Sequence, residues 1–253
     1  MKIALCLQGQ PRNWRVGYEF INKEIISKYN VDVFCHTWWS EDMIGEFYDS
    51  SPWSPPIYVV EPNLISEISV AYNFKKFKYE KSKKFVPARR YNIDGNHDAI
   101  YDAFCSRFYS LNQVLTLLKD YEKETTIDYD WVIITRTDIG IYNWPDFSLP
   151  KYNKEHIYVS NYHRGRKYIY NDNLWVCGKN RKYDFINMFN DFDKTYDMQL
   201  NVKNTLYAQQ IIDTELFDCK YIGAETMLVF HLLFNGVLDK VKTIDELDYN
   251  VIR

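Results

Sequence analysis

The sequence lacks several features that would assign it to a class at once. Its five cysteines are scattered and form no C-x-x-C pair, so neither a zinc site nor a disulfide framework is indicated. No apolar run approaches the roughly 20 residues that a membrane-spanning helix needs, and the opening run "MKIALCLQGQ" is too short for a signal peptide. We therefore expect a soluble, cytoplasmic protein in which Cys6 and Cys35 act as small hydrophobic residues.

An excess of positive charge is also missing. The 253 residues carry a formal net charge of −3, and no nucleic-acid-binding motif is present, so nucleic acid is not an expected partner. Internal repeats and low-complexity tracts are absent from the sequence. The length and the 46% hydrophobic content suit one substantial globular domain.

The N-terminal third alternates between strand-like and helix-like patterns. An apolar strand ends at Gly9, residues 14–29 place apolar side chains at helical spacing, and "VDVFCHTWW" (31–39) predicts a second strand. "IYVVEP" (57–62) predicts a third strand, stopped by Pro62. Strand, helix and strand in this order form a βαβ unit, which favours a parallel sheet covered by helices.

The longest periodic segment predicts a helix over residues 98–122. Apolar residues recur there at intervals of three or four, at Ile100, Phe104, Phe108, Leu111, Leu115 and Leu118. Further strands are predicted at 130–139, 156–160 and 172–178, and helices near 180–192, 205–217 and 225–235. The predicted fold class is α/β, a mostly parallel sheet flanked by helices.

Two charges interrupt the apolar stretch "DWVIITRTDIGIY" (130–142) where its strand should end. Side chains two residues apart on a strand share a face, so Arg136 and Asp138 would project together. In open α/β sheets, ligands bind at the carboxyl ends of the strands. Asp138 could hold a divalent cation while Arg136 pairs with a phosphate or orients the carboxylate. The alternative is a structural ion pair that tethers a loop.

Three segments resemble a known family. "ALCLQGQPR", "DVFCHTWW" and "DWVIITRTDIGIY" are similar to segments of GT-A-type nucleotide-sugar glycosyltransferases of the sort found in bacterial polysaccharide clusters and some large viruses. The resemblance implies a GT-A-like, Rossmann-like single domain, a nucleoside-diphosphate-sugar donor and a glycan or lipid-linked glycan acceptor. Residues 1–140 would bind the nucleotide-sugar and residues 141–253 the acceptor.

The resemblance also implies a metal and a nucleotide site. In the family, a D-x-D motif holds Mn²⁺ or Mg²⁺ on the donor diphosphate; here that position reads Arg136-Thr137-Asp138, which leaves Asp138 as the metal ligand. The loop from Gln8 to Arg12 matches the place that receives the nucleotide. Gly9 permits close backbone approach, and Arg12 is placed to contact the base or the diphosphate.

The end of the second strand is a further candidate. His36 and Thr37, followed by Trp38, occupy the position where this fold contacts a ribose or base. A packed aromatic corner is the alternative interpretation of the same residues.

A C-terminal segment resembles the acceptor helix of inverting GT-A enzymes, E-D-x-D-L-x-x-R-L-x-x-x-G. In "AETMLVFHLLFNG", Glu225 takes the place of the catalytic base, and His231 replaces the arginine. Glu225 would lie in the first turn of a helix, where the dipole favours a carboxylate, and would accept the proton of the attacking hydroxyl. The alternative for Glu225 is an ordinary helix-start glutamate, whereas His231, in a mostly apolar helix, is expected to be a packed side chain instead of a ligand.

Two more segments are candidates for binding. In "YNDNLWVCGKN", Asp172 precedes a short strand and a glycine, as in related transferases; it would bind sugar hydroxyls, or act as the base in place of Glu225, or be a turn aspartate. Residues 75–90 (Lys75–Arg90) carry eight basic residues against one glutamate. They form a solvated face, or a clamp that closes over the diphosphate, or a peripheral contact with the inner face of an anionic membrane.

The leading hypothesis is an inverting glycosyltransferase that uses a nucleoside-diphosphate sugar. A sugar-phosphate nucleotidyltransferase shares the sheet, although its first loop usually has more glycines than "QGQPR". A non-catalytic glycan-binding protein is the third hypothesis, suggested by the 17% aromatic content and the missing first acid of D-x-D.

Overall fold

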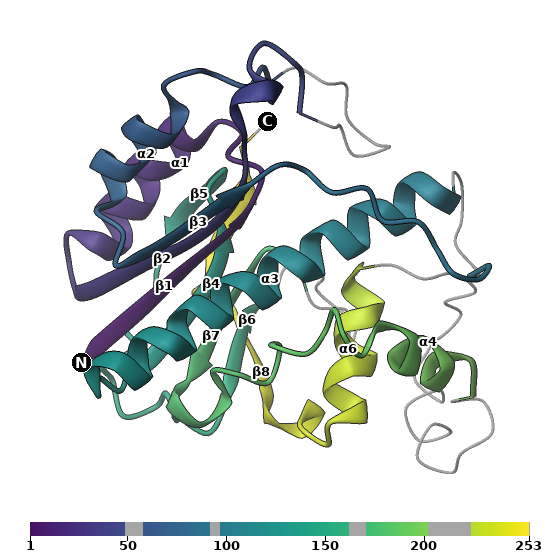
Figure 1. Cartoon of the computed structure of the whole chain (residues 1–253). Coiled ribbons are helices and arrows are strands. Elements are labelled where there is room, and N and C mark those ends of the chain that lie inside the picture. The colour runs from purple at the N-terminus through teal and green to yellow at the C-terminus, as the bar shows by residue number, and fades with distance from the viewer. Residues whose placement is uncertain (49–57, 92–96, 162–170, 202–223, 253) are drawn as a thin grey trace.

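A seven-stranded sheet forms the centre of the computed structural model, which describes residues 1–48, 58–91, 97–161, 171–201 and 224–252 (Figure 1). The strands follow the order β3-β2-β1-β4-β7-β6-β8. Their bounds are β1 (Lys2–Gly9), β2 (Asn30–Trp38), β3 (Lys76–Glu80), β4 (Trp131–Arg136), β6 (Ile157–Ser160), β7 (Leu174–Gly178) and β8 (Val241–Ile244). β7 is antiparallel to β4 and to β6, and the other pairings are parallel, so the predicted mostly parallel α/β sheet is confirmed.

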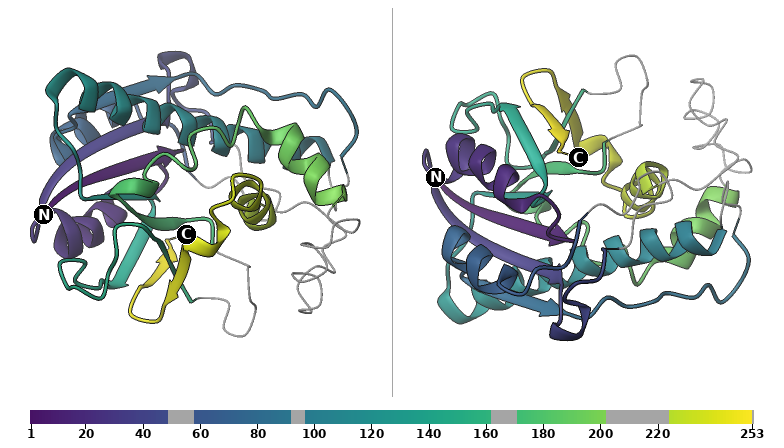
Figure 2. Two further views of the ribbon diagram at one scale, coloured as in Figure 1. Left: turned by 90° about the horizontal axis from the view of Figure 1, so that it is seen from below. Right: turned by 90° about the horizontal axis from the view of Figure 1, so that it is seen from above.

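Helices cover both faces of this sheet. Their bounds are α1 (Trp14–Ile21), α2 (Leu64–Tyr72), α3 (His97–Thr125), α4 (Phe192–Asn201) and α6 (Ala224–Phe234), with short turns of π-helix at Asn22–Ile26 and of 3-10 helix at Glu41–Met43, Lys179–Arg181 and Leu238–Lys240. Side chains of β1 alternate between the two cores: Leu5 belongs to the core that includes residues of α1 and α2, and Cys6 to the core that includes residues of α3 and α6. Figure 2 shows α1 and α3 on opposite sides of the strands. An apolar run without alternation is therefore the expected sequence for β1.

Two predicted helices and the burial of two cysteines are confirmed. The helix predicted at 98–122 is α3, and that predicted at 225–235 is α6. Cys6 and Cys35 are buried and unpaired, and burial raises the pKa of both thiols. Within the described residues, no helix combines the length and the apolar character that a membrane crossing requires.

The third strand was predicted in the wrong segment. Of 57–62, the described residues make one isolated bridge, between Phe47 and Val59, and the strand beside β2 is β3 in the basic segment. A parallel neighbour of β2 can form only after a crossover connection. Residues 57–62 precede α2, which is that crossover, so their apolar character reflects burial, as Val60 shows by its 1% exposure.

Two further predictions were wrong. The strand expected over 130–139 is divided: β4 ends at Arg136, and β5 (Ile139–Asn143) pairs instead with β9 (Asp248–Val251) in a separate two-stranded sheet. The helix expected at 180–192 is a series of turns in which most of the bonded amides reach three residues back, as Ile186 does to Tyr183. Apolar side chains three residues apart face the core in such turns as they would in a helix. The helix predicted near 205–217 lies outside the described residues.

Candidate functional site

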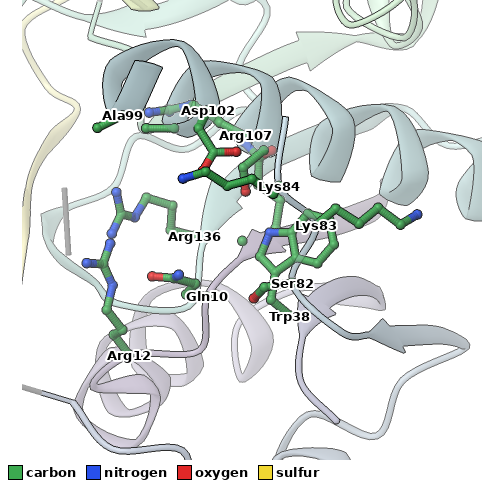
Figure 3. A pocket seen from close by; sticks show the side chains of 14 residues that line it. Gln10, Arg12, Trp38, Ser82, Lys83, Lys84, Ala99, Asp102, Arg107 and Arg136 are labelled. Carbon is green, nitrogen blue, oxygen red and sulfur yellow. The ribbon is translucent and has the colours of Figure 1, made fainter. Parts of the chain in front are cut away.

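A cavity of about 270 Å³ lies at the carboxyl ends of β1, β2 and β4 (Figure 3). The strand ends contribute Gln8, Gly9, Trp38 and Arg136. Opposite them lie the N-terminal half of α3 and the segment that follows β3, and the remaining lining residues are Gln10, Arg12, Ser82, Lys83, Lys84, Ala99, Asp102, Ala103, Ser106 and Arg107. The ligand edge predicted from the sequence is therefore hollow.

The surface of this cavity is cationic. Five basic side chains line it with one carboxylate, that of Asp102: they are Arg12, Lys83, Lys84, Arg107 and Arg136. The acids that balance Arg136 and Arg107 lie behind them, because the side chains of Asp138 and Asp172 are only 3% and 10% exposed. Positive groups in front of recessed acids give the cavity an attractive field for an anion.

Arg136 and Asp138 do project together, as predicted. Arg136 Nε donates to Asp138 Oδ1 at 2.6 Å and Nη2 donates to Oδ2 at 2.5 Å, a bidentate pair. Arg12 Nε lies 3.9 Å from the same Oδ2, and Figure 3 shows the two guanidinium groups next to each other. Burial acts to lower the pKa of Arg136, but the charges of Asp138 and Asp172 outweigh it and raise that pKa.

The donor set around Asp138 does not fit a divalent cation. Among the described residues, no three His, Cys, Asp or Glu side chains form a group that could hold a metal ion. Mg²⁺ and Mn²⁺ take several oxygen ligands, whereas both Asp138 oxygens face guanidinium groups. The divalent cation that the D-x-D resemblance implies stays a prediction, and in the described residues the oxygens of Asp138 are taken up by arginine.

The first loop lies in the cavity, with its backbone fixed from both sides. Gly9 has a φ of 94°, a region that favours glycine. Its N–H donates to Ser110 Oγ at 2.9 Å, and its carbonyl accepts from Thr37 Oγ1 at 2.8 Å. Gln8 is 4% exposed and its Oε1 has no hydrogen-bond partner among the described residues, so an acceptor oxygen is left for a ligand.

His36 and Thr37 lie behind the cavity instead of lining it, since both are fully buried. Burial lowers the pKa of His36 to about 4, so its ring is neutral, and Glu80 offsets this only partly. His36 Nε2 donates to ionised Glu80 at 3.0 Å, and Nδ1 accepts from Ser110 Oγ at 2.7 Å. Glu80 also binds Lys83 at 2.8 Å. The network therefore joins the first loop to a lysine across the cavity.

Asp172 and Glu225 form an acidic pair beside Arg107. Arg107 donates to Asp172 Oδ2, while its Nη2 is buried and has no partner among the described residues. Burial raises the pKa of Glu225, and the charge of Asp172 adds to this; a backbone hydrogen bond at the start of α6 and the charge of Arg107 act in the opposite direction. The effect of burial on the pKa of Glu225 thus outweighs the stabilisation of its carboxylate that was expected from the start of the helix.

His231 was expected to be a packed side chain, and this is confirmed. It is 1% exposed, and its Nε2 bonds the carbonyl oxygen of Asp184 at 2.8 Å.

Sequence reasoning missed the α3 side of the cavity. α3 contributes small residues, one aspartate and one arginine to the lining, with Ser110 one turn further; they are Ala99, Asp102, Ala103, Ser106 and Arg107. The spacing of three and four was present in the predicted helix. An arginine among small residues on the non-apolar face was the available signal for this side of the site.

The fold and the site together define an α/β protein with a cationic cavity at the carboxyl edge of a mostly parallel sheet. No family model matches the sequence, and a search of curated proteins found no match. Solved structures similar to the chain include a glycosyltransferase involved in the glycosylation of the major capsid of PBCV-1, at 10% identity and a TM-score of 0.34 over 96% of this chain and 81% of that one.

Two further similar structures also match over 96% of this chain. The galactosyltransferase LgtC in complex with donor and acceptor sugar analogues has 11% identity and a TM-score of 0.40, with 73% of its chain covered. Mouse xyloside xylosyltransferase 1, in its apo form, has 8% identity and a TM-score of 0.39, with 85% covered. Likeness at this level carries no argument about activity, which has to come from the site.

Proposed function

We propose that the protein is a glycosyltransferase that moves a sugar from a nucleoside diphosphate to a glycan acceptor. The observation that carries the proposal is the cationic cavity beside the Asp172–Glu225 pair. Sugar transfer needs fixed positive charge where the diphosphate leaves, and a base near the attacking hydroxyl. The cavity and the acidic pair supply these two functions side by side, joined by Arg107.

In the proposed reaction, the acceptor hydroxyl oxygen bonds to the anomeric carbon as the bond from that carbon to the diphosphate oxygen breaks. The electron pair leaves with the diphosphate, whose charge Arg136 and Arg107 stabilise. The hydroxyl proton passes to the Glu225 carboxylate, and Asp172, held by Arg107, orients the sugar hydroxyls. A single displacement of this kind inverts the anomeric configuration.

The cavity accommodates part of the donor. Its volume of about 270 Å³ is close to the lower limit of ligand pockets, roughly 300 Å³, so it suits the diphosphate and the adjoining part of the nucleoside. The unpaired Gln8 oxygen is placed to accept from a ribose or base donor group. The sugar would extend from the cavity toward Asp172 and Glu225.

Nucleotide binding followed by product analysis tests the proposal. Thermal unfolding is measured with UDP, GDP, CMP and ADP, each with EDTA or Mn²⁺, and at 100 times Kd a bound nucleotide should stabilise the fold by about 2.7 kcal/mol. The matching nucleotide-sugar is then incubated with glycan acceptors, and release of the nucleoside diphosphate is followed.

Three results would overturn the proposal. If no nucleotide shifts the unfolding temperature, the proposed donor class is wrong. Stabilisation by free oligosaccharide alone indicates a glycan-binding protein. Release of pyrophosphate from a nucleoside triphosphate and a sugar phosphate indicates a nucleotidyltransferase.

A further inference from the structure

Asp138 is surrounded in a way that suits a carboxylate holding arginine side chains in place. Its side chain is 3% exposed, and its two oxygens accept the two Arg136 hydrogen bonds of 2.6 and 2.5 Å, with Arg12 Nε 3.9 Å from one of them. Asp138 itself does not line the cavity, whereas Arg12 and Arg136 both do. The carboxylate therefore lies on the protein side of the arginines, and the arginines lie on the ligand side.

A divalent cation at Asp138 would meet this arrangement unfavourably. The cation would first have to displace Arg136 from its bidentate contact. It would then lie close to two guanidinium groups, and positive charges in contact repel strongly in a partly buried site. Among the described residues, no group of three His, Cys, Asp or Glu side chains is present that could offset that cost. In the alignment with D-x-D, Arg136 occupies the position of the first acid.

Other cations reach the same cavity from two further elements. Lys83 and Lys84 follow β3, and Arg107 comes from α3. The buried Nη2 of Arg107 has no partner among the described residues, so it is a donor available to an anion. One guanidinium group can donate two parallel N–H hydrogen bonds to the oxygens of a phosphate, which fixes the geometry of the contact.

We infer that arginine and lysine side chains hold the donor diphosphate without a divalent cation, and that Asp138 positions Arg136 and Arg12 for this task. The inference rests on the proposed function and deepens it, because it assigns the positive charge in that site to the chain itself. Arg136 and Arg107 contact the diphosphate, and Asp138 is a positioning residue that keeps the Arg136 fork facing the cavity.

The first test compares nucleotide binding with and without metal. The nucleoside diphosphate that stabilises the fold most is titrated calorimetrically into the whole chain in EDTA, in Mg²⁺ and in Mn²⁺. We expect the three Kd values to agree within about twofold. Binding that is lost in EDTA and restored by Mn²⁺ overturns the inference but leaves the proposed function standing. If no nucleotide binds under any condition, the proposed function falls, and the inference with it.

Asp138→Asn separates a positioning residue from a metal ligand. As a positioning residue, Asp138 matters in EDTA as much as in Mn²⁺, so the variant should weaken binding about tenfold in both. If Asp138 is a metal ligand, the variant keeps the wild-type Kd in EDTA and loses only the gain from Mn²⁺; that result overturns the inference. Arg136→Ala should weaken binding by about 10- to 100-fold in EDTA.

Lys83→Ala serves as the variant that leaves the fold intact, because its side chain is 42% exposed. It should weaken binding at least severalfold in EDTA, and an unchanged Kd contradicts the inference. Lys81→Ala is the matched control: Lys81 lies two residues away, is 64% exposed, pairs with Asp42 and does not line the cavity. Its Kd should equal that of the wild type.

Discussion

Two opposing effects act on the pKa of Glu225. The start of α6 and Arg107 favour its carboxylate, but burial and the charge of Asp172 prevail and raise its pKa. A base with a raised pKa takes a proton more readily at neutral pH. The same shift means that the residue is protonated, and inactive as a base, at a higher pH than an ordinary glutamate.

Replacing Glu225 by glutamine should lower kcat by about 10²- to 10⁴-fold and leave the Kd of the nucleotide unchanged. In the wild type, kcat should fall as the pH falls through the raised pKa of Glu225. Both effects are measured by nucleoside-diphosphate release in the presence of acceptor. Glu246→Gln, at an exposed position paired with Lys151, is the control; a Glu225→Gln enzyme with wild-type kcat would remove this residue from the role.

His36 makes stability depend on pH. Its folded-state pKa is about 4, below the unfolded value of 6.5, chiefly because of burial, so below pH 6.5 the unfolded chain binds a proton that folded His36 does not. Stability should therefore fall by on the order of 3 kcal/mol from pH 7 to pH 4. Burial acts to raise the pKa of Glu80, but hydrogen bonds, among them those from Lys83 and His36, lower this pKa to about 2. Glu80 therefore stays ionised between pH 7 and pH 4.

Urea unfolding at pH 7 and pH 4 measures this loss, and His36→Asn isolates it. The variant should be less stable than the wild type at pH 7 because of its altered packing, but its stability should change less between the two pH values. Equal pH dependence in both proteins would show that His36 is not the group responsible.

At the scale of elements, α1 holds the connection between β4 and β5 in place. A Cβ at Gly17 would lie 1.9 Å from the carbonyl oxygen of Thr137, so the helix packs directly on the backbone next to Asp138. Gly17→Ala should destabilise the fold by about 1–3 kcal/mol, and it should weaken nucleotide binding because Asp138 shifts with its backbone.

Chemical denaturation and nucleotide titration of Gly17→Ala check both effects. Gly140→Ala is the control, since its Cβ would meet the exposed Tyr142 side chain at 3.1 Å, which can move aside. A Gly17→Ala protein as stable as this control would contradict the packing argument.

Elements with strong periodicity could be predicted from the sequence, and elements defined by their partners could not. α3 repeats its apolar residues over 29 residues, and residues 3–7 of β1 are uniformly apolar, so local pattern was enough. The break after Arg136 was not visible, because Ile139 continues the apolar run although it pairs with another sheet. β3 was hidden in the basic segment, since an edge strand tolerates lysines; membrane contact by that segment stays a prediction.

At the scale of the whole molecule, local sequence patterns predicted one part of the site and long-range packing hid the other. Gln8, Gly9, Arg12 and Arg136 were predicted because each lies at or just after the end of a strand, and the carboxyl ends of parallel strands meet at one edge. Arg107 reaches that edge only because α3 packs across β1 and β2 from about 100 residues away in the chain. Such long-range packing leaves no mark in the local pattern.

The central sheet joins the two parts of the chain, residues 1–140 and 141–253, and this affects how they unfold. β4, from the part assigned to the nucleotide, is hydrogen-bonded to β7, from the part assigned to the acceptor. One core contains residues from both, among them Cys6, Trp175 and Phe230. The other core likewise contains residues from both parts, so we expect one cooperative transition in scanning calorimetry, with equal calorimetric and van't Hoff enthalpies. A bound nucleotide should move the whole transition upward without splitting it. Two separate transitions, with only one moved by nucleotide, would show that residues 1–140 fold independently despite the shared sheet.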